Sequence, residues 1–227
     1  YLNADEEPVD PGDPDAEHKF AALDRTFGSY SGSLGAAFDV SDDFVVKANV
    51  SRGYRAPNLS ELTSNGRHEG SFRYEVGNAD LEPETSFQMD ASLSFNSDHV
   101  TIDVDAFHNA LSNYIYSVKL QSTFGGDSIA DPDDPAPVFQ YAQGKANLYG
   151  GEIAIDIHPH PWDWLHFENS FSLVRGIQPD RPDSSKYLPL IPAPKLTTEL
   201  RANFRKWGSR LTNVFAKVSG DVFFTQN

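Results

Sequence analysis

Strict alternation of apolar and polar residues over 86–96 constrains the fold of this chain more than any other feature. One face of this segment would carry Phe87, Met89, Ala91, Leu93 and Phe95, and the other Ser86, Gln88, Asp90, Ser92, Ser94 and Asn96. A period of two residues is the side-chain spacing of a β-strand, whereas a helix repeats every 3.6 residues. The segment therefore predicts a strand with one apolar face and one polar face.

The same alternation recurs in seven further segments, which predicts an all-β chain. We expect these strands near 31–40, 44–51, 100–116, 152–157, 165–173, 196–204 and 210–224. Short turns follow the odd-numbered strands of this series. Long polar connections follow the even-numbered strands, at about 53–84, 117–146 and 175–194. The chain thus forms hairpins that place all turns at one end of the sheet and all long loops at the other.

The asymmetry between short turns and long loops indicates an outer-membrane barrel, whose turns face the periplasm and whose loops are extracellular. We therefore expect an all-β, antiparallel, up-and-down transmembrane β-barrel segment of about eight strands. Lipid would accept the apolar face. A wet or plug-filled lumen would accept the polar face, where we place Asp90, Asp103, Asp105, His166 and Glu168. A soluble β-sandwich, whose polar face would meet solvent, is the alternative that the alternation leaves open.

Composition restricts the functions that fit this chain. Its 227 residues carry a formal net charge of −15. Such an acidic chain does not offer the basic footprint that nucleic acids require, so we expect no nucleic-acid partner. No run of about 18 apolar residues is present, which excludes a transmembrane helix, but a barrel strand needs only about 9–11 residues with alternate ones apolar.

We divide the chain into an acidic, proline-rich extracellular loop over 1–30 and a partial barrel over 31–227. No signal peptide precedes Tyr1, and the chain stops at Asn227 shortly after an apparent strand, so we expect a piece of something longer. Eight strands could close a small barrel, but the many lumenal carboxylates favour a segment of a larger one.

Several motifs in this chain resemble those of the TonB-dependent outer-membrane receptors. Three of them surround the first long loop at 51–62, 64–70 and 73–86, and others follow in the family's order at 113–116, 149–152 and 190–195. The residues that match the family motif at strand–loop junctions are Arg52, Gly53, Tyr54, Arg55, Ala56, Pro57, Glu61, Asn78 and Leu81. The resemblance covers about 30–227.

The resemblance implies a plugged barrel of about 22 strands in the outer membrane of a Gram-negative bacterium. It implies a transporter and not an enzyme, which takes up a ferric siderophore, haem or zinc with energy passed on by the TonB complex. The implied partners are outer-membrane lipid, TonB through a plug and N-terminal segment that this chain lacks, and a small metal-containing ligand. No intrinsic cofactor is expected.

His68 is the leading candidate for a ligand-binding residue. It lies between Tyr54-Arg55-Ala56-Pro57 and Asn78-Ala79-Asp80-Leu81, which stand where haem receptors of the family carry Phe-Arg-Ala-Pro and Asn-Pro-Asn-Leu boxes. A neutral imidazole is a good ligand for zinc or haem iron, and we expect Glu69 and His18 to assist it. A solvated loop histidine is the alternative.

Other polar residues are expected to have structural roles. Arg55 would pair with Glu61 or hold the end of its strand. His158 and His160 lie in a short turn, where capture of a substrate is not expected, and His166 would contact the plug.

Two other classes of function stay open. One is a lipase-like barrel enzyme, although the stretch 28–32 has Tyr30 where a nucleophile elbow would have serine. The other is an adhesin barrel that transports nothing.

Overall fold

The structure is a computed structural model that describes residues 1–5, 22–68, 70–130 and 135–226. The predicted ligands His18 and Glu69 lie outside the described residues. The chain divides into two compact units. The loop unit comprises Tyr1–Ser31, Gly53–Ser86 and Leu111–Lys145, and the sheet unit comprises Gly32–Arg52, Phe87–Ala110 and Ala146–Asn227.

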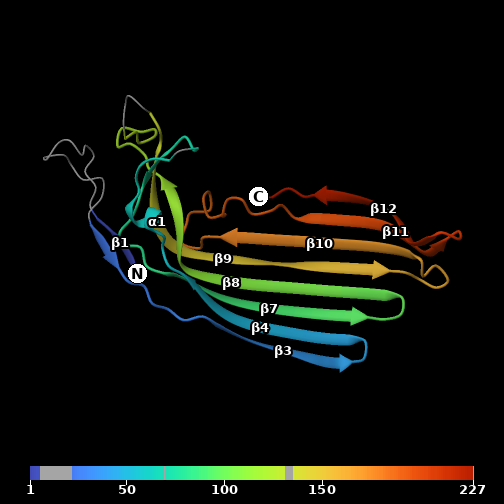
Figure 1. Ribbon diagram of the computed structural model, residues 1–227. Coiled ribbons are helices and arrows are strands. Elements are labelled where there is room, and N and C mark those ends of the chain that lie inside the picture. Colours follow the sequence, from blue (N-terminus) through green and yellow to red (C-terminus); the bar gives the residue numbers. More distant parts are fainter. Residues whose placement is uncertain (6–21, 69, 131–134, 227) are drawn as a thin grey trace. The chain divides into compact units, whose positions relative to one another are not determined.

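Eight long strands form an antiparallel sheet in the order β12-β11-β10-β9-β8-β7-β4-β3 (Figure 1). Their bounds are β3 Gly32–Ser41, β4 Phe44–Arg55, β7 Glu84–Asn96, β8 Val100–Lys119, β9 Val138–Ile157, β10 Leu165–Ile177, β11 Lys195–Trp207 and β12 Leu211–Phe223. Each long strand pairs with the next long strand in the chain, which confirms the up-and-down arrangement. Within the described residues the order ends at β3 and β12, so the sheet is open.

Short and long connections alternate as the sequence predicted. The short turns are 42–43, 97–99, 158–164 and 208–210, and the long connections are 56–83, 120–137 and 178–194. The predicted start of one strand was wrong, because β9 begins at Val138 and not near residue 152, and β4, β8 and β10 each end three or four residues later than predicted. The first half of β9 lacks a clear period of two, and the alternation therefore revealed only its end.

Gly150 and Gly151 show why the middle of β9 carries no side chains. A Cβ added to Gly151 would lie 2.5 Å from the carbonyl oxygen of Asp105 in β8, and one added to Gly150 would collide with the carbonyl oxygen of Leu173 in β10. Real Cβ atoms do not approach a backbone oxygen so closely. The strands on both sides of β9 therefore pack against bare backbone at this level.

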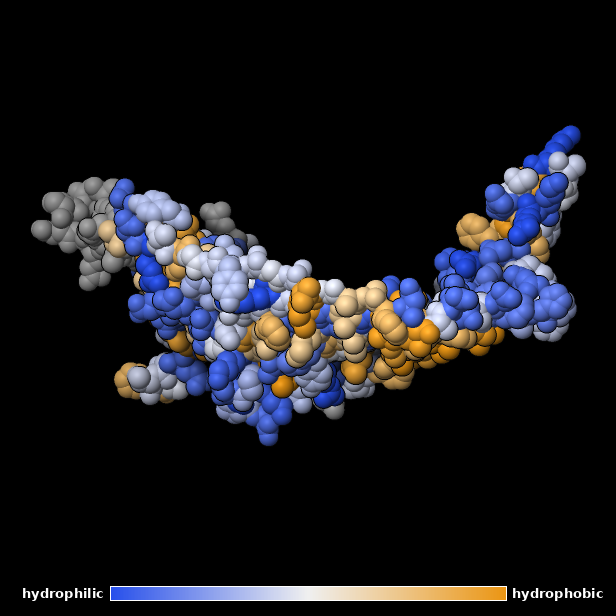
Figure 2. Space-filling view, turned by 90° about the horizontal axis from the view of Figure 1, so that it is seen from below, coloured by the Kyte–Doolittle hydropathy of each residue, from blue (hydrophilic) through white to orange (hydrophobic). Residues whose placement is uncertain are grey.

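One face of the sheet is apolar and exposed. Phe87, Met89 and Leu93 remain 48%, 46% and 42% exposed, although each is large and apolar. Cross-strand pairs continue this face through Leu34, Phe38, Ile153, Phe167, Phe171, Leu200 and Val218. Figure 2 shows apolar side chains gathered in a band along the strands. No second layer of described residues covers this face, which fits contact with lipid and not the core of a sandwich.

The opposite face carries the polar side chains that were predicted to line a lumen. Asn49 Nδ2 donates to Asp90 Oδ2 over 3.1 Å, and Ser94 Oγ donates to Asp103 Oδ1 over 2.6 Å. Asp105 accepts a hydrogen bond from the hydroxyl of Ser92. These three carboxylates thus accept hydrogen bonds from side chains of neighbouring strands, which holds this part of the polar face in one conformation.

The loop unit contains short elements that the sequence did not predict. They are β1 Leu2–Ala4, β2 Leu23–Arg25, α1 Leu59–Thr63, β5 Asn65–Arg67 and β6 Tyr74–Val76. β1 pairs with β2 inside the stretch predicted as an acidic loop, and β6 pairs with both β5 and β9. A small core of Leu23, Leu62, Leu81 and Ile115 packs β2, α1 and β8 together, with Leu2 and Ala4 of β1 against it. Among the described residues, no helix is long and apolar enough to cross a membrane.

Candidate ligand-binding site

Arg55 joins three segments of the loop unit, and its expected ion pair with Glu61 is present. The guanidinium lies at the end of β4, with its Nη1 atom 2.9 Å from Glu61 Oε2 in α1. Its Nη2 atom lies 3.2 Å from Glu84 Oε2 at the start of β7. The two carboxylates are largely buried, with 12% and 15% of their side chains exposed. One cation therefore balances two buried anions, which fixes how the loop leaves and rejoins its strands.

Glu61 also determines where α1 begins. Its carboxylate accepts the backbone N–H of Asn58 over 2.8 Å, while the Asn58 side chain accepts the backbone N–H of Glu61 over 2.8 Å. This reciprocal capping box satisfies two N–H groups that a helix start leaves without partners. The short helix therefore forms at this position, although five residues would not be helical by themselves.

The second family box, at 78–81, is also built into the core of the loop unit. The backbone N–H of Asn78 donates to the Glu61 carbonyl over 2.9 Å, and its side chain donates to the Tyr141 carbonyl over 3.3 Å. Leu81 is 1% exposed and packs in the core, and Pro57 of the first box is fully buried. These motif residues hold the loops and leave little surface for a ligand.

The other motif residues occupy β4 and the residue that follows it. Arg52 is paired with Gly32 across the ladder to β3, in the sheet unit. A Cβ on Gly53 would lie 2.9 Å from the Ser86 hydroxyl, within the loop unit. Tyr54 is 45% exposed, and Ala56 follows β4. Tyr54 is therefore the motif residue with a large apolar surface open to contact.

His68 lies in the connection between β5 and β6 and is exposed. Its backbone N–H donates to the Arg73 carbonyl over 3.1 Å, which closes the tip of this hairpin. A depression of about 460 Å³ is lined by Arg67, His68, Gly70, Ser71 and Phe72. The Arg67 guanidinium lies 5.0 Å from the centre of the Phe72 ring. The hairpin tip thus offers an imidazole, a cation and an aromatic face together, and a metal-binding role for His68 stays a prediction.

The sheet unit brings together three residues that sequence reasoning had separated. Asp156, His158 and His166 each offer one ligand atom, and these atoms lie within 4.8 Å of one another. His158 had been assigned to a turn and His166 to a plug contact. The register of the β9–β10 hairpin could have predicted this cluster. Phe167 pairs with Ile157, and continuing this register by one residue toward the turn places His166 opposite His158.

A second polar cluster lies in the adjoining turns. Asp163 Oδ2 is 3.1 Å from His160 Nδ1, and Asp163 Oδ1 is 3.5 Å from His99 Nδ1. Desolvation raises the pKa of the Asp163 carboxyl, but the hydrogen bond from His160 and the charges of both histidines outweigh it and bring the pKa below its ordinary value. Asp163 therefore remains an anion beside these imidazoles at neutral pH.

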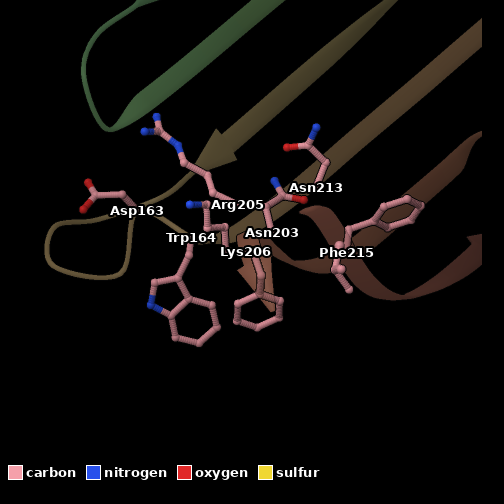
Figure 3. A pocket seen from close by; sticks show the side chains of 9 residues that line it. Asp163, Trp164, Asn203, Arg205, Lys206, Asn213 and Phe215 are labelled. Atoms are coloured by element: carbon pink, nitrogen blue, oxygen red, sulfur yellow. The ribbon is translucent and has the colours of Figure 1, made fainter. Parts of the chain in front are cut away.

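An aromatic cluster at the same end of the sheet borders a groove of about 820 Å³ (Figure 3). The rings of Trp164 and Phe204 stack with their centres 5.5 Å apart, and Trp207 meets Phe204 edge-on at 5.0 Å. Arg205 and Lys206 also line the groove. Girdles of aromatic residues flank the apolar band of outer-membrane barrels. The cluster therefore has the composition of a membrane interface at the turn end of the strands.

Comparison with known proteins agrees with this architecture. The chain is 28% identical over 138 residues to the iron-regulated outer membrane virulence protein of Vibrio cholerae O1 strain N16961, which covers 59% of this chain and 21% of that protein. It is 28% identical over 132 residues to the ferrienterobactin receptor of Escherichia coli K12, which covers 53% of this chain and 18% of that protein. The chain thus spans about a fifth of the length of these curated relatives.

Among solved structures, the siderophore receptor PirA from Pseudomonas aeruginosa shares the fold with a TM-score of 0.53 and 22% identity, covering 89% of this chain and 32% of that chain. The sequence profile of the family described as "TonB dependent receptor-like, beta-barrel" matches residues 4–227. Because this match spans nearly the whole sequence, the chain belongs to the β-barrel family of the TonB-dependent receptors and is part of the outer membrane of a Gram-negative bacterium.

Proposed function

We propose that the protein containing this chain imports a ferric siderophore across the outer membrane. The observation that carries the proposal is the similarity to an outer-membrane protein named as iron-regulated and to a receptor named for ferrienterobactin, which in each case extends over more than half of the chain. Energy would come from the TonB complex, through segments outside these 227 residues. Membership of the TonB-dependent receptor family favours import over the lipase-like and adhesin alternatives.

The tip of the β5–β6 hairpin is the contact surface we propose for the ligand. It is exposed, and it presents His68 beside Arg67 and Phe72 around one depression. A ferric chelate has a flat or lobed organic shell, which an aromatic ring and an imidazole can pack against. By contrast, the boxes that would flank a haem ligand are occupied by structural contacts of Arg55, Glu61 and Leu81.

The charge of the loop unit narrows the class of siderophore. Acidic side chains outnumber basic ones in each of its three segments. Such a surface lowers the local concentration of anions and raises that of cations. A ferric trihydroxamate is neutral or cationic, whereas a ferric tricatecholate carries three negative charges. We therefore propose a trihydroxamate-type complex as the preferred ligand.

The test is uptake of radioactive iron by the full-length receptor in a strain without its own siderophore receptors. We expect energy-dependent uptake from a ferric trihydroxamate, slower uptake from a tricatecholate, and no growth support from haem or zinc. The variant His68→Ala should reduce uptake at unchanged surface abundance, whereas His108→Ala in β8 should not. If a correctly exported receptor takes up no ferric siderophore of either class, the proposal is wrong.

A further inference from the structure

We propose that the polar wall of the sheet carries a binding site for a divalent transition-metal ion of the zinc type, formed by Asp156, His158 and His166. This site is distinct from the proposed siderophore contact, because all three residues belong to the sheet unit and His68 belongs to the loop unit. The proposal does not depend on which ligand the receptor imports.

The hairpin between β9 and β10 builds the site. Asp156 is the second-last residue of β9, His158 follows the strand, and His166 is the second residue of β10. Side chains two residues apart in a strand share a face, so Asp156 and His158 point the same way. The register places His166 across from His158, and the two rings lie 4.8 Å apart between centres. Backbone geometry alone thus brings the three side chains to one point.

The distances between donor atoms are close to those of a metal centre. His166 Nδ1 lies 2.8 Å from Asp156 Oδ2, and His158 Nδ1 lies 3.5 Å from the same oxygen. Tetrahedral zinc with bonds of about 2.0–2.1 Å separates its ligands by about 3.3 Å. All three ligand atoms lie within 4.8 Å of one another, which is near the spacing that a shared zinc ion requires.

Two buried atoms of the cluster have no hydrogen-bond partner among the described residues. They are Asp156 Oδ1 and His158 Nδ1. An enclosed polar atom without a partner costs free energy, and a metal ion held by Asp156 Oδ2 and the two imidazoles would satisfy His158 Nδ1. The neighbouring carboxylate does not compete for the ion, because Glu168 forms an ion pair with Arg201.

The ligand set selects the kind of ion. Two imidazoles and one carboxylate suit zinc and its neighbours, whereas calcium and magnesium prefer oxygen ligands alone. Three protein ligands leave a fourth position for water or an incoming group. The side chains are partly exposed, so an ion can reach the site from the polar face of the sheet.

Zinc titration of the full-length, tag-free receptor in detergent, after treatment with a chelator, tests the proposal. We expect wild type to bind one zinc ion more than the double variant His158→Ala/His166→Ala. The variant Asp156→Asn should weaken the binding of this ion, because the amide lacks the charge of the carboxylate ligand. The matched control is His108→Ala, which removes a histidine of β8 outside the cluster and should leave the stoichiometry unchanged.

A second measurement covers the case in which the double variant misfolds. Zinc added to wild-type receptor should slow hydrogen exchange in the 157–165 hairpin, and cobalt bound in its place should give a visible absorption band that His166→Gln abolishes. Equal zinc stoichiometry and affinity in wild type and a folded double variant overturns the proposal. So does unchanged exchange of this hairpin in zinc-loaded wild type.

Discussion

Replacing Arg55 by methionine should loosen the loop unit without unfolding the sheet. Methionine keeps much of the length of the side chain but removes the cation, which leaves Glu61 and Glu84 as two largely buried carboxylates without their shared partner. Their mutual repulsion and lost hydrogen bonds both favour opening of the loop. The family motif that contains Arg55 would then have a structural role, which is to hold the extracellular loops closed.

The size of the effect follows from three contacts. The guanidinium donates twice to Glu61, over 2.9 and 3.0 Å, and once to Glu84 over 3.2 Å. A hydrogen bond to a charged group contributes about 1.5–3 kcal/mol, but the Arg55 side chain is 44% exposed and solvent screens part of this. We take about 2.5 kcal/mol as the free energy by which these three contacts together stabilise the closed loop. Their loss corresponds to a roughly 60-fold larger population of the open loop.

Hydrogen exchange of the full-length receptor measures this population. The reporting amides are those of Leu62, Gly77 and Asn78, which donate to carbonyls inside the loop unit. We expect about 60-fold faster exchange at these amides and no change in the long strands. The matched control is Lys217→Met, which removes a cation paired with Glu199 in the sheet unit and should leave exchange at these three amides of the loop unit unchanged. Exchange at the three amides that rises by less than about threefold would refute the reasoning.

Three further predictions address other parts of the chain. Gly151→Ala should destabilise the sheet by about 1–3 kcal/mol, measured by urea unfolding of the receptor in lipid vesicles, because its Cβ would meet the Asp105 carbonyl. Leu81→Ala should destabilise the loop unit by about 2–5 kcal/mol, seen as faster hydrogen exchange there, because it leaves a cavity in the core. The hydrogen bond and charge of Lys186 hold the pKa of the Asp183 carboxyl below its ordinary value. That pair should therefore protect the loop above a pH of about 3.9 and lose this effect as the pH falls through the lowered pKa, measured by hydrogen exchange corrected for intrinsic rates.

The long strands could be predicted from sequence because one face of each strand is apolar and the other polar, so that apolar and polar residues alternate along it. The row from Phe87 to Phe95 shows this pattern without interruption, and β7 begins and ends within two residues of the prediction. The pattern fails in the first half of β9, where apolar and polar residues do not alternate, and it is interrupted again at Gly150 and Gly151, where the close approach of neighbouring strands leaves no room for a Cβ.

The short elements of the loop unit could not be predicted in the same way. Five residues are too few for a helical period, and α1 depends on its cap and on packing of Leu62 in the core. The role of Arg55 was predicted only as an alternative, because sequence spacing does not show that Glu84 approaches the same guanidinium. The cluster at Asp156 was missed because it depends on the register of a hairpin and not on residue spacing.

The hydrogen bonds and ion pairs of the polar face distribute charge unevenly between its strands. On β7 and β8, Asp90, Asp103 and Asp105 accept hydrogen bonds from uncharged amide and hydroxyl groups, which supply no balancing charge. On β10 and β11, Glu168 and Glu199 are instead neutralised by arginine and lysine partners. The wall is therefore electrically uneven, and mobile counter-ions should collect along one sector of it. A cationic chelate passing this wall would be drawn to that sector, whereas an anionic one would be repelled from it.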